Sequence, residues 1–194
     1  MTTTYPPTYS CTTSTPWGRA QYAAKYAPGI ICYSTAGHGG FHLSSTRNAQ
    51  VHPAWRSLDG WYEEDCQWAV VAITFPAAFP GDAVAEAHQS AKRWMPHEYM
   101  AALGVEVSPE ESYILQVEAF HAEHKNDLLA IVAYGDWADW VPEGKVRVGA
   151  CIAGREGTGK VERYFLVDAE RYDSHGKFSY VIDPSVDVEC EGEK

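Results

Sequence analysis

The stretch of sequence from Gly29 to Pro76 constrains the fold more than any other part of the chain. Its first half is an apolar run that enters the polar corner STAGHGG (residues 34–40) and leaves it through a second short apolar run. The glycines of the corner allow a tight turn, so this half predicts two paired strands. In the second half, residues 61–75, three acidic residues precede an apolar run without a polar face. Such a run is typical of a buried helix, and we expect it to be the central helix of the fold.

The remaining segments predict an α+β fold, with helices in the N-terminal and middle parts and strands at the end. Thr15 followed by proline predicts the start of a helix that ends near residue 27, and further helices are expected from Asp82, Pro96 and Ser108. From Leu128 onward, four β-rich runs alternate with Gly, Pro and Asp. Short connections of this kind predict an antiparallel meander, and the separation of helices from strands predicts the α+β class.

The length of 194 residues suits one good-sized domain. Residues 1–14 consist almost entirely of Thr, Ser, Pro and Tyr, which predicts a flexible tail. We expect a single α+β domain over residues 15–187. Residues 188–194 are rich in glutamate and predict an acidic C-terminal tail.

Composition and charge exclude several classes of protein. Apolar residues make up 45% of the chain and aromatic residues 13%, which excludes a disordered acidic protein. The formal net charge of -11 opposes direct binding to nucleic acid and favours basic partners. The five cysteines include no CxxC pair, which opposes a disulfide framework or a zinc ribbon. The sequence predicts neither a secretory signal nor a membrane span, so we expect a cytoplasmic protein.

One motif imitates a phosphate-binding loop. Residues 154–161, GREGTGKV, fit the pattern GxxxxGK. However, Val161 stands where a Ser or Thr hydroxyl would meet magnesium, and the next residues predict a strand instead of a helix. A helix N-terminus supplies much of the phosphate affinity of such loops. We therefore interpret this segment as a glycine-rich connection between two strands.

The corner around His38 is the strongest candidate for chemistry. If it folds over the start of the predicted helix, His38 would meet Glu63, Asp65 and Cys66, which we take as candidate catalytic residues. Imidazole, thiolate and carboxylate are the ligands that zinc prefers, and a Cys-His enzyme with Cys66 as nucleophile is a further option. The neighbouring carboxylates would raise the pKa of that thiol, which makes its activation doubtful. The alternative is purely structural: glycines shape a turn, acids start a helix and Cys66 fills core space.

A second candidate feature is a pair of tryptophans in the sequence GDWADW. Trp137 and Trp140 lie there in a predicted loop, with acidic residues beside the rings. Exposed tryptophan next to aspartate is common in protein interfaces, so we take both as candidate binding residues. The alternative is that the two rings close the edge of the core.

Several longer segments resemble a known family: TPWGRAQYAAKYAPGI, YSTAGHGGFHLS and GWYEEDCQWAVVAITFP, and near the end RYFLVDAERY and FSYVIDP. The chain resembles an uncharacterised family of proteins encoded by phages, plasmids and proteobacteria, with the signatures YST-x-x-HGGF-x-LS and GWYEEDC-x-WA. The resemblance implies a phage or mobile-element setting and names no activity. It also implies that the two signatures share a site, which adds these candidate binding residues: Ser34, Thr35, Gly39, Gly40 and Trp61.

Two functional hypotheses follow, and the first is narrowly preferred. It is a small acidic, non-enzymatic protein that binds a host or defence-system protein, in the manner of an anti-CRISPR or antirestriction factor. The partner would be a protein, such as a basic nucleic-acid-handling one, and neither nucleic acid itself nor a membrane. The alternative is a metal-dependent or Cys/His enzyme built on His38, Glu63, Asp65 and Cys66. We expect no cofactor under the first hypothesis, and zinc is the metal considered under the second.

Overall fold

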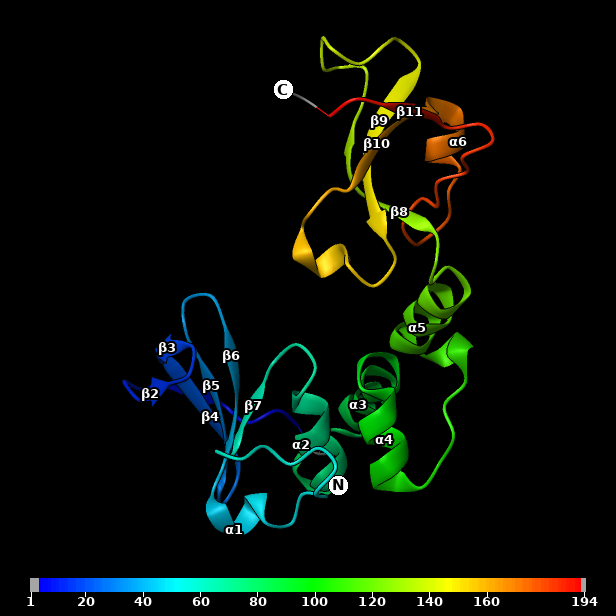
Figure 1. Cartoon of the computed structure of the whole chain (residues 1–194). Helices are drawn as coiled ribbons and strands as arrows, with labels where there is room; N and C mark the ends of the chain where they lie inside the picture. The colour runs from blue at the N-terminus through cyan, green and yellow to red at the C-terminus, as the bar shows by residue number, and fades with distance from the viewer. Residues whose placement is uncertain (1–3, 193–194) are drawn as a thin grey trace. The chain divides into compact units, whose positions relative to one another are not determined.

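The computed structural model describes residues 4–192, and the chain divides into two compact units, residues 1–115 and 116–194 (Figure 1). Each unit has its own hydrophobic core, and the two sets of buried residues have no member in common. The sequence predicted one domain over residues 15–187. The structure instead gives two cores because each sheet buries its apolar face with side chains from its own part of the chain.

Unit 1 contains a five-stranded antiparallel sheet with the strand order β1-β4-β5-β6-β7. Its strands are β1 (Thr8–Ser10), β4 (Tyr22–Ala27), β5 (Ile30–Ser34), β6 (Gly39–Leu43) and β7 (Trp61–Glu63). Two short strands, β2 (Ser14–Thr15) and β3 (Gly18–Arg19), form a separate hairpin. The paired strands predicted around residues 34–40 are confirmed, with Ser34 opposite Gly39.

The helix predicted from Thr15 is wrong, because these residues form β2, β3 and β4. Gly18 has a φ of 112°, which no helix contains, and β4 pairs with β1 on one side and β5 on the other. Pairing on both sides satisfies the backbone of this segment, and this tertiary effect overrides its local helix preference. The predicted tail also differs: Thr8–Ser10 is the edge strand β1, while residues 1–3 lie outside the described part.

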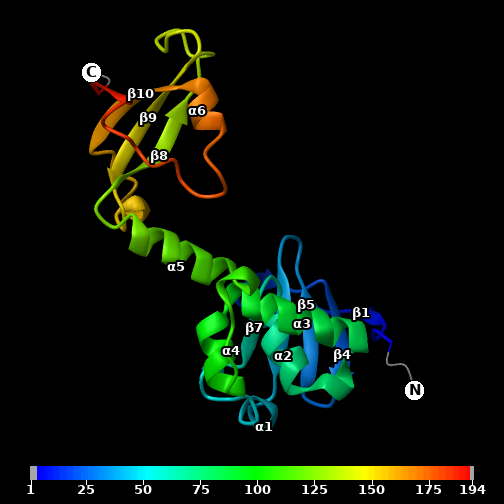
Figure 2. The ribbon, with the colours of Figure 1, turned by 90° about the vertical axis from the view of Figure 1, so that its right-hand side faces the viewer.

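The helices of unit 1 are α1 (Ser45–Asn48), α2 (Trp68–Thr74), α3 (Gly81–Trp94) and α4 (Pro96–Leu103), with short 3₁₀ segments η1 (Pro76–Ala78) and η2 (Pro109–Glu111). In unit 1, α2, α3 and α4 lie on one side of the sheet, and α1 lies at one end of it (Figure 1, Figure 2). Helix α3 contributes Ala83, Ala87 and Ala91 to the core at every fourth residue. This alanine stripe forms one face of α3 and allows close approach to α2.

The predicted central helix is confirmed as a buried helix, but only in its second half. Helix α2 begins at Trp68, and its residues 69–72 are all buried. Residues 61–63 are β7, in which Tyr62 pairs with Phe41 and is 1% exposed. The Tyr62 hydroxyl donates to Asn48 Oδ1, which anchors the strand to α1. The acidic residues therefore lie at a strand end and in a turn, not in the first turn of a helix.

Unit 2 contains the predicted antiparallel meander, with the strand order β11-β10-β9-β8. Its strands are β8 (Leu128–Tyr134), β9 (Lys145–Ile152), β10 (Arg163–Asp168) and β11 (Val188–Cys190). The other elements are α5 (Tyr113–Glu123), which crosses the boundary in sequence, η3 (Glu156–Thr158) and α6 (Ala169–Asp173). The α+β class is thus confirmed.

Two details of unit 2 differ from the prediction. Residues 188–190 of the expected acidic tail form β11, where Glu189 accepts from Arg163 Nε at 2.8 Å; residues 193–194 lie outside the described part. The last predicted strand, residues 178–182, is reduced to a single bridge between Val181 and Leu129. Residues 154–161, which fit the phosphate-binding pattern GxxxxGK, lie between β9 and β10 and are followed by a strand, as predicted. Among residues 4–192, no helix combines the length and apolar character needed to cross a membrane.

Candidate metal centre at the His38 corner

His38 lies in the turn between β5 and β6, and Thr35 fixes the shape of that turn. The Thr35 hydroxyl donates to the His38 carbonyl at 2.7 Å and accepts from the His38 amide at 3.1 Å. The Thr35 amide donates to the same carbonyl at 2.7 Å. These bonds hold the backbone of His38, so Thr35, predicted as a binding residue, has a structural role in the turn.

Gly39 and Gly40 are required because neighbouring groups come too close for a side chain. A Cβ on Gly39 would lie 2.8 Å from the Tyr33 carbonyl oxygen and 2.4 Å from Glu64 Oε2. A Cβ on Gly40 would lie 2.3 Å from both the Tyr62 carbonyl oxygen and the Trp17 ring. The two glycines thus allow β7, the acidic residues and Trp17 to approach the corner.

Strand β7 brings the acidic residues to His38 from the other side. His38 Nδ1 lies 3.1 Å from Glu64 Oε1 and 3.5 Å from Glu63 Oε1. One ligand atom from each of His38, Glu63 and Asp65 lies within 4.8 Å of the others. The structure therefore brings together three of the four candidate catalytic residues, with Glu64 as the direct partner of the imidazole.

The carboxylates differ in their local hydrogen bonds. Glu63 Oε1 accepts from the Asp65 amide at 2.8 Å, and Oε2 accepts from the Cys66 amide at 3.3 Å. These bonds hold Glu63 in place, and its side chain is only 25% exposed. In the described part of the chain, the Asp65 carboxylate accepts no hydrogen bond. With His38 43% exposed, Asp65 and His38 remain accessible to an ion from solvent.

Cys66 lies next to this cluster, but its chemistry differs from that of the sequence hypothesis. Burial raises the pKa of the Cys66 thiol, and the charges of Glu63 and Asp65 raise it further. A thiol with a raised pKa stays protonated at neutral pH and is a poor nucleophile. Its contribution to the corner is the backbone amide that binds Glu63.

Aromatic rings surround the corner on the side of β3 and β7. Trp61, a predicted binding residue, packs against His42 at 4.5 Å and Tyr33 at 5.5 Å between ring centroids. Trp17 makes an edge contact with Trp61 at 5.7 Å and lies 6.2 Å from the His38 ring. The rings give the corner a rigid support, because each is held by at least one other.

Sequence reasoning missed Trp17 and Arg19, which share a groove with His38. The groove has a volume of about 450 Å³ and is lined by Trp17, Arg19 and residues 35–38. Both residues were predicted to lie on a helix, and only the β2–β3 hairpin places them at the corner. No local pattern could have shown this, because the hairpin and the corner are joined through tertiary packing.

The remaining predicted binding residues are not part of this cluster. Ser34 ends β5, where its carbonyl accepts from the Gln21 amide at 2.8 Å. Trp137 and Trp140 belong to unit 2, in the connection between β8 and β9. Trp137 is 76% exposed, whereas Trp140 packs on Tyr134 at a centroid distance of 4.9 Å.

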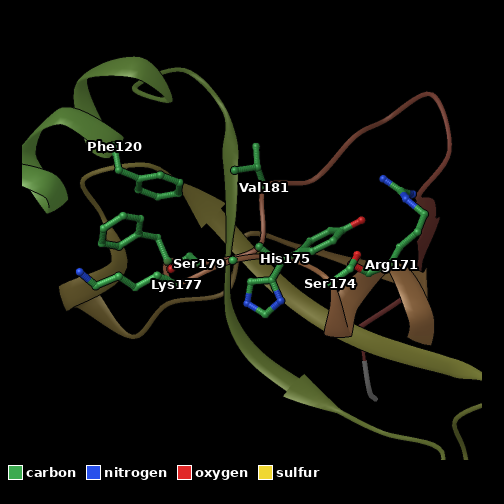
Figure 3. A pocket seen from close by; sticks show the side chains of 10 residues that line it. Phe120, Arg171, Ser174, His175, Lys177, Ser179 and Val181 are labelled. Carbon is green, nitrogen blue, oxygen red and sulfur yellow. The ribbon is translucent and has the colours of Figure 1, made fainter.

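A second cavity, of about 400 Å³, lies within unit 2, and its lining includes Arg171, His175 and Lys177 (Figure 3). Arg171 and Lys177 lie at opposite sides of it, so their charges do not converge on one point. Arg171 is paired with the buried carboxylate of Asp187, and Lys177 donates to Gln116. These bonds within the protein give the basic groups a structural role, and the His38 corner is the stronger candidate site.

The family described as "Domain of unknown function (DUF7007)" matches residues 10–125 of the chain. No curated protein and no solved structure matches the sequence. The family match contains the His38 corner, its acidic residues, Trp17 and Arg19, whereas Trp137 and Trp140 lie outside it. With more than half of its length matched, the chain belongs to this family of domains of unknown function.

Proposed function

We propose that the domain binds a divalent metal ion through His38, Glu63 and Asp65. The observation that carries the proposal is the approach of their three ligand atoms to within 4.8 Å of one another. Around a tetrahedral zinc ion, each ligand atom lies about 2.0–2.2 Å from the metal, so two ligand atoms are roughly 3.4 Å apart. Rotations of the exposed His38 and Asp65 side chains would have to bring the ligand atoms closer by up to about 1.4 Å to close the site.

The fold supports this proposal by removing the simplest alternative for the acidic residues. The sequence offered the start of a helix as the reason for three consecutive acids, but α2 begins at Trp68 and has no acidic residue in its first turn. The carboxylates of Glu63, Glu64 and Asp65 instead crowd around one histidine. Like charges this close repel one another, and a divalent cation would relieve the repulsion.

The ligand set indicates the kind of ion and its use. One imidazole and two carboxylates suit Zn²⁺ or Mn²⁺, and Glu64 can orient the His38 ring from outside the ligand set. Three protein ligands leave coordination positions open to water, as in catalytic sites. We therefore favour metal-assisted hydrolysis over Cys/His catalysis, since the raised pKa of Cys66 opposes a thiolate nucleophile.

Calorimetric titration of the full chain with Zn²⁺ and Mn²⁺ tests the site. We expect one bound ion per chain, with affinity at least about tenfold weaker in His38→Ala and in Asp65→Asn. His124→Ala is the matched control, because His124 also pairs with a carboxylate, Asp127 at 2.8 Å, but lies in unit 2. Circular dichroism would check that each variant is folded. Equal metal affinity in wild type, His38→Ala and Asp65→Asn would refute the proposal.

A second candidate function is binding to a basic protein partner, and the exposure of Trp137 favours it. This ring is 76% exposed between Asp136 and Asp139, and the chain carries a net charge of -11. Exposed tryptophan with flanking charge is typical of interface hot spots. The resemblance to phage and plasmid proteins supports a host or defence protein that handles nucleic acid as the partner, with an action in the cytoplasm.

Pull-down from a bacterial host lysate would test this second function. Trp137→Ala should lose a partner that wild type and Trp94→Ala retain, and salt should weaken its binding. Trp94 is a suitable control because it is also exposed, at 41%. A basic partner that Trp137→Ala retains fully at all salt concentrations would contradict this function.

A further inference from the structure

The groove beside the His38 corner indicates what the proposed metal centre would bind. We propose that it takes a ligand with an oxyanion and a planar ring, such as an aromatic phosphate monoester, whose oxyanion lies between the metal ion and Arg19. The inference rests on the proposed metal site. It draws on three features of the groove in unit 1: an unpaired cation, a tryptophan ring and an open turn.

Arg19 is the first feature. It is exposed on β3, and in the described part of the chain no carboxylate lies within ion-pairing distance of it. It differs in this from two other exposed arginines, since Arg163 binds Glu189 and Arg155 binds Glu162. A guanidinium group presents a planar set of donors that matches the oxygens of phosphate or carboxylate. Its charge is thus available to a ligand in the groove.

The charges of the acidic residues determine the conditions under which an anion can bind in the groove. Without a metal ion, Glu63, Glu64 and Asp65 would repel an oxyanion from the neighbourhood of His38. A bound divalent ion would offset two of these charges and offer open coordination positions to the anion. Anion binding should therefore depend on both the metal and Arg19.

Trp17 and the open turn are the features that would bind the planar ring of the ligand. The indole of Trp17 is held by Trp61 and by its close approach to Gly40, so its position is fixed. It lines the groove together with Gly37, where an added Cβ would meet no atom within 4 Å. The space over the turn is open, and a planar group can enter it and contact the indole ring.

Calorimetric titration with phenyl phosphate tests the inference in the full chain. Wild type should bind phenyl phosphate in the presence of Mn²⁺ and not in EDTA. Arg19→Gln should bind Mn²⁺ normally and phenyl phosphate at least about tenfold more weakly, as expected for a lost charge-assisted hydrogen bond. Lys25→Gln removes the same charge from the exposed face of β4 and should match wild type. Inorganic phosphate should bind several-fold more weakly than phenyl phosphate.

The possible outcomes separate the two proposals. Normal binding of Mn²⁺ with no effect of Arg19→Gln on phenyl phosphate, or with no binding of phenyl phosphate at all, would overturn the inference and leave the metal site intact. Equal affinity for inorganic phosphate and phenyl phosphate would show that Trp17 does not bind the phenyl ring of the ligand, and would overturn that part of the inference. No binding of Mn²⁺ or Zn²⁺ by wild type would overturn the metal site, and with it the inference.

Discussion

The close packing at Gly40 leads to the sharpest prediction of the fold, tested by Gly40→Ala. The new Cβ would lie 2.3 Å from the Tyr62 carbonyl oxygen and from the Trp17 ring, whereas ordinary contacts begin at 3.4 Å. These neighbours would have to move by about 1.1 Å. Neither can do so freely, because Gly40 is paired with Glu63 in the β6–β7 ladder and Trp17 is held by Trp61. Overpacking combined with partial loss of the ladder should destabilise unit 1 by about 3 kcal/mol.

Urea denaturation followed by tryptophan fluorescence would measure this change, with thermal unfolding as a second probe. A loss of 3 kcal/mol corresponds to a decrease in Tm of about 6–12 °C for a chain of this size. Gly37→Ala is the matched control: its Cβ meets no atom within 4 Å and its φ is not positive. That variant should match wild type or gain up to about 1 kcal/mol from reduced freedom of the unfolded chain. If Gly40→Ala stayed within about 1 kcal/mol of wild type, the tight approach of β7 and Trp17 would be wrong.

Two further predictions concern buried groups. The carboxylate of Asp187 is fully buried and accepts hydrogen bonds from Arg171 and Tyr180, so Asp187→Asn should lower the free energy of unfolding, measured in urea, by about 2–3 kcal/mol. Glu189→Gln, at an exposed ion pair, should change the free energy of unfolding by less than about 1 kcal/mol. Equal effects of the two substitutions would contradict this difference in burial. Burial, followed by the charge of Glu64, raises the pKa of Cys32 from 9.0 to about 11. Because the folded state holds this proton more tightly, the resulting stability is complete below about pH 9 and is lost as pH rises towards 11, by up to about 2 kcal/mol. Urea titrations between pH 8 and 11 should show this slope in wild type, and an unchanged slope in Cys32→Ala would contradict the assignment.

The sequence predicted a helix or strand correctly where residues close together in the chain define that element. Helix α3 and the strands β8 to β10 were predicted because each has a period or a boundary that neighbouring residues define. Strand β4, YAAKYA, suits a helix or a strand equally well, and only pairing with β1 and β5 decides between them. The acidic residues before α2 were ambiguous in the same way, since their position before an apolar run imitates a helix start.

For the candidate site, the sequence indicated His38 as the central residue, and the tertiary structure determined which residues surround it. A histidine within a glycine-rich turn already marked His38, because a turn requires glycines but no imidazole. The partners of His38 depend on β6–β7 pairing, which places Glu63 and Glu64 beside residues that are more than twenty positions away in sequence. The sequence alone determined the α+β class, the C-terminal meander and the histidine at the corner. Only the tertiary structure decided that the acids meet this histidine and that Trp17 and Arg19 line its groove, since strand pairing and packing between distant segments leave no local pattern.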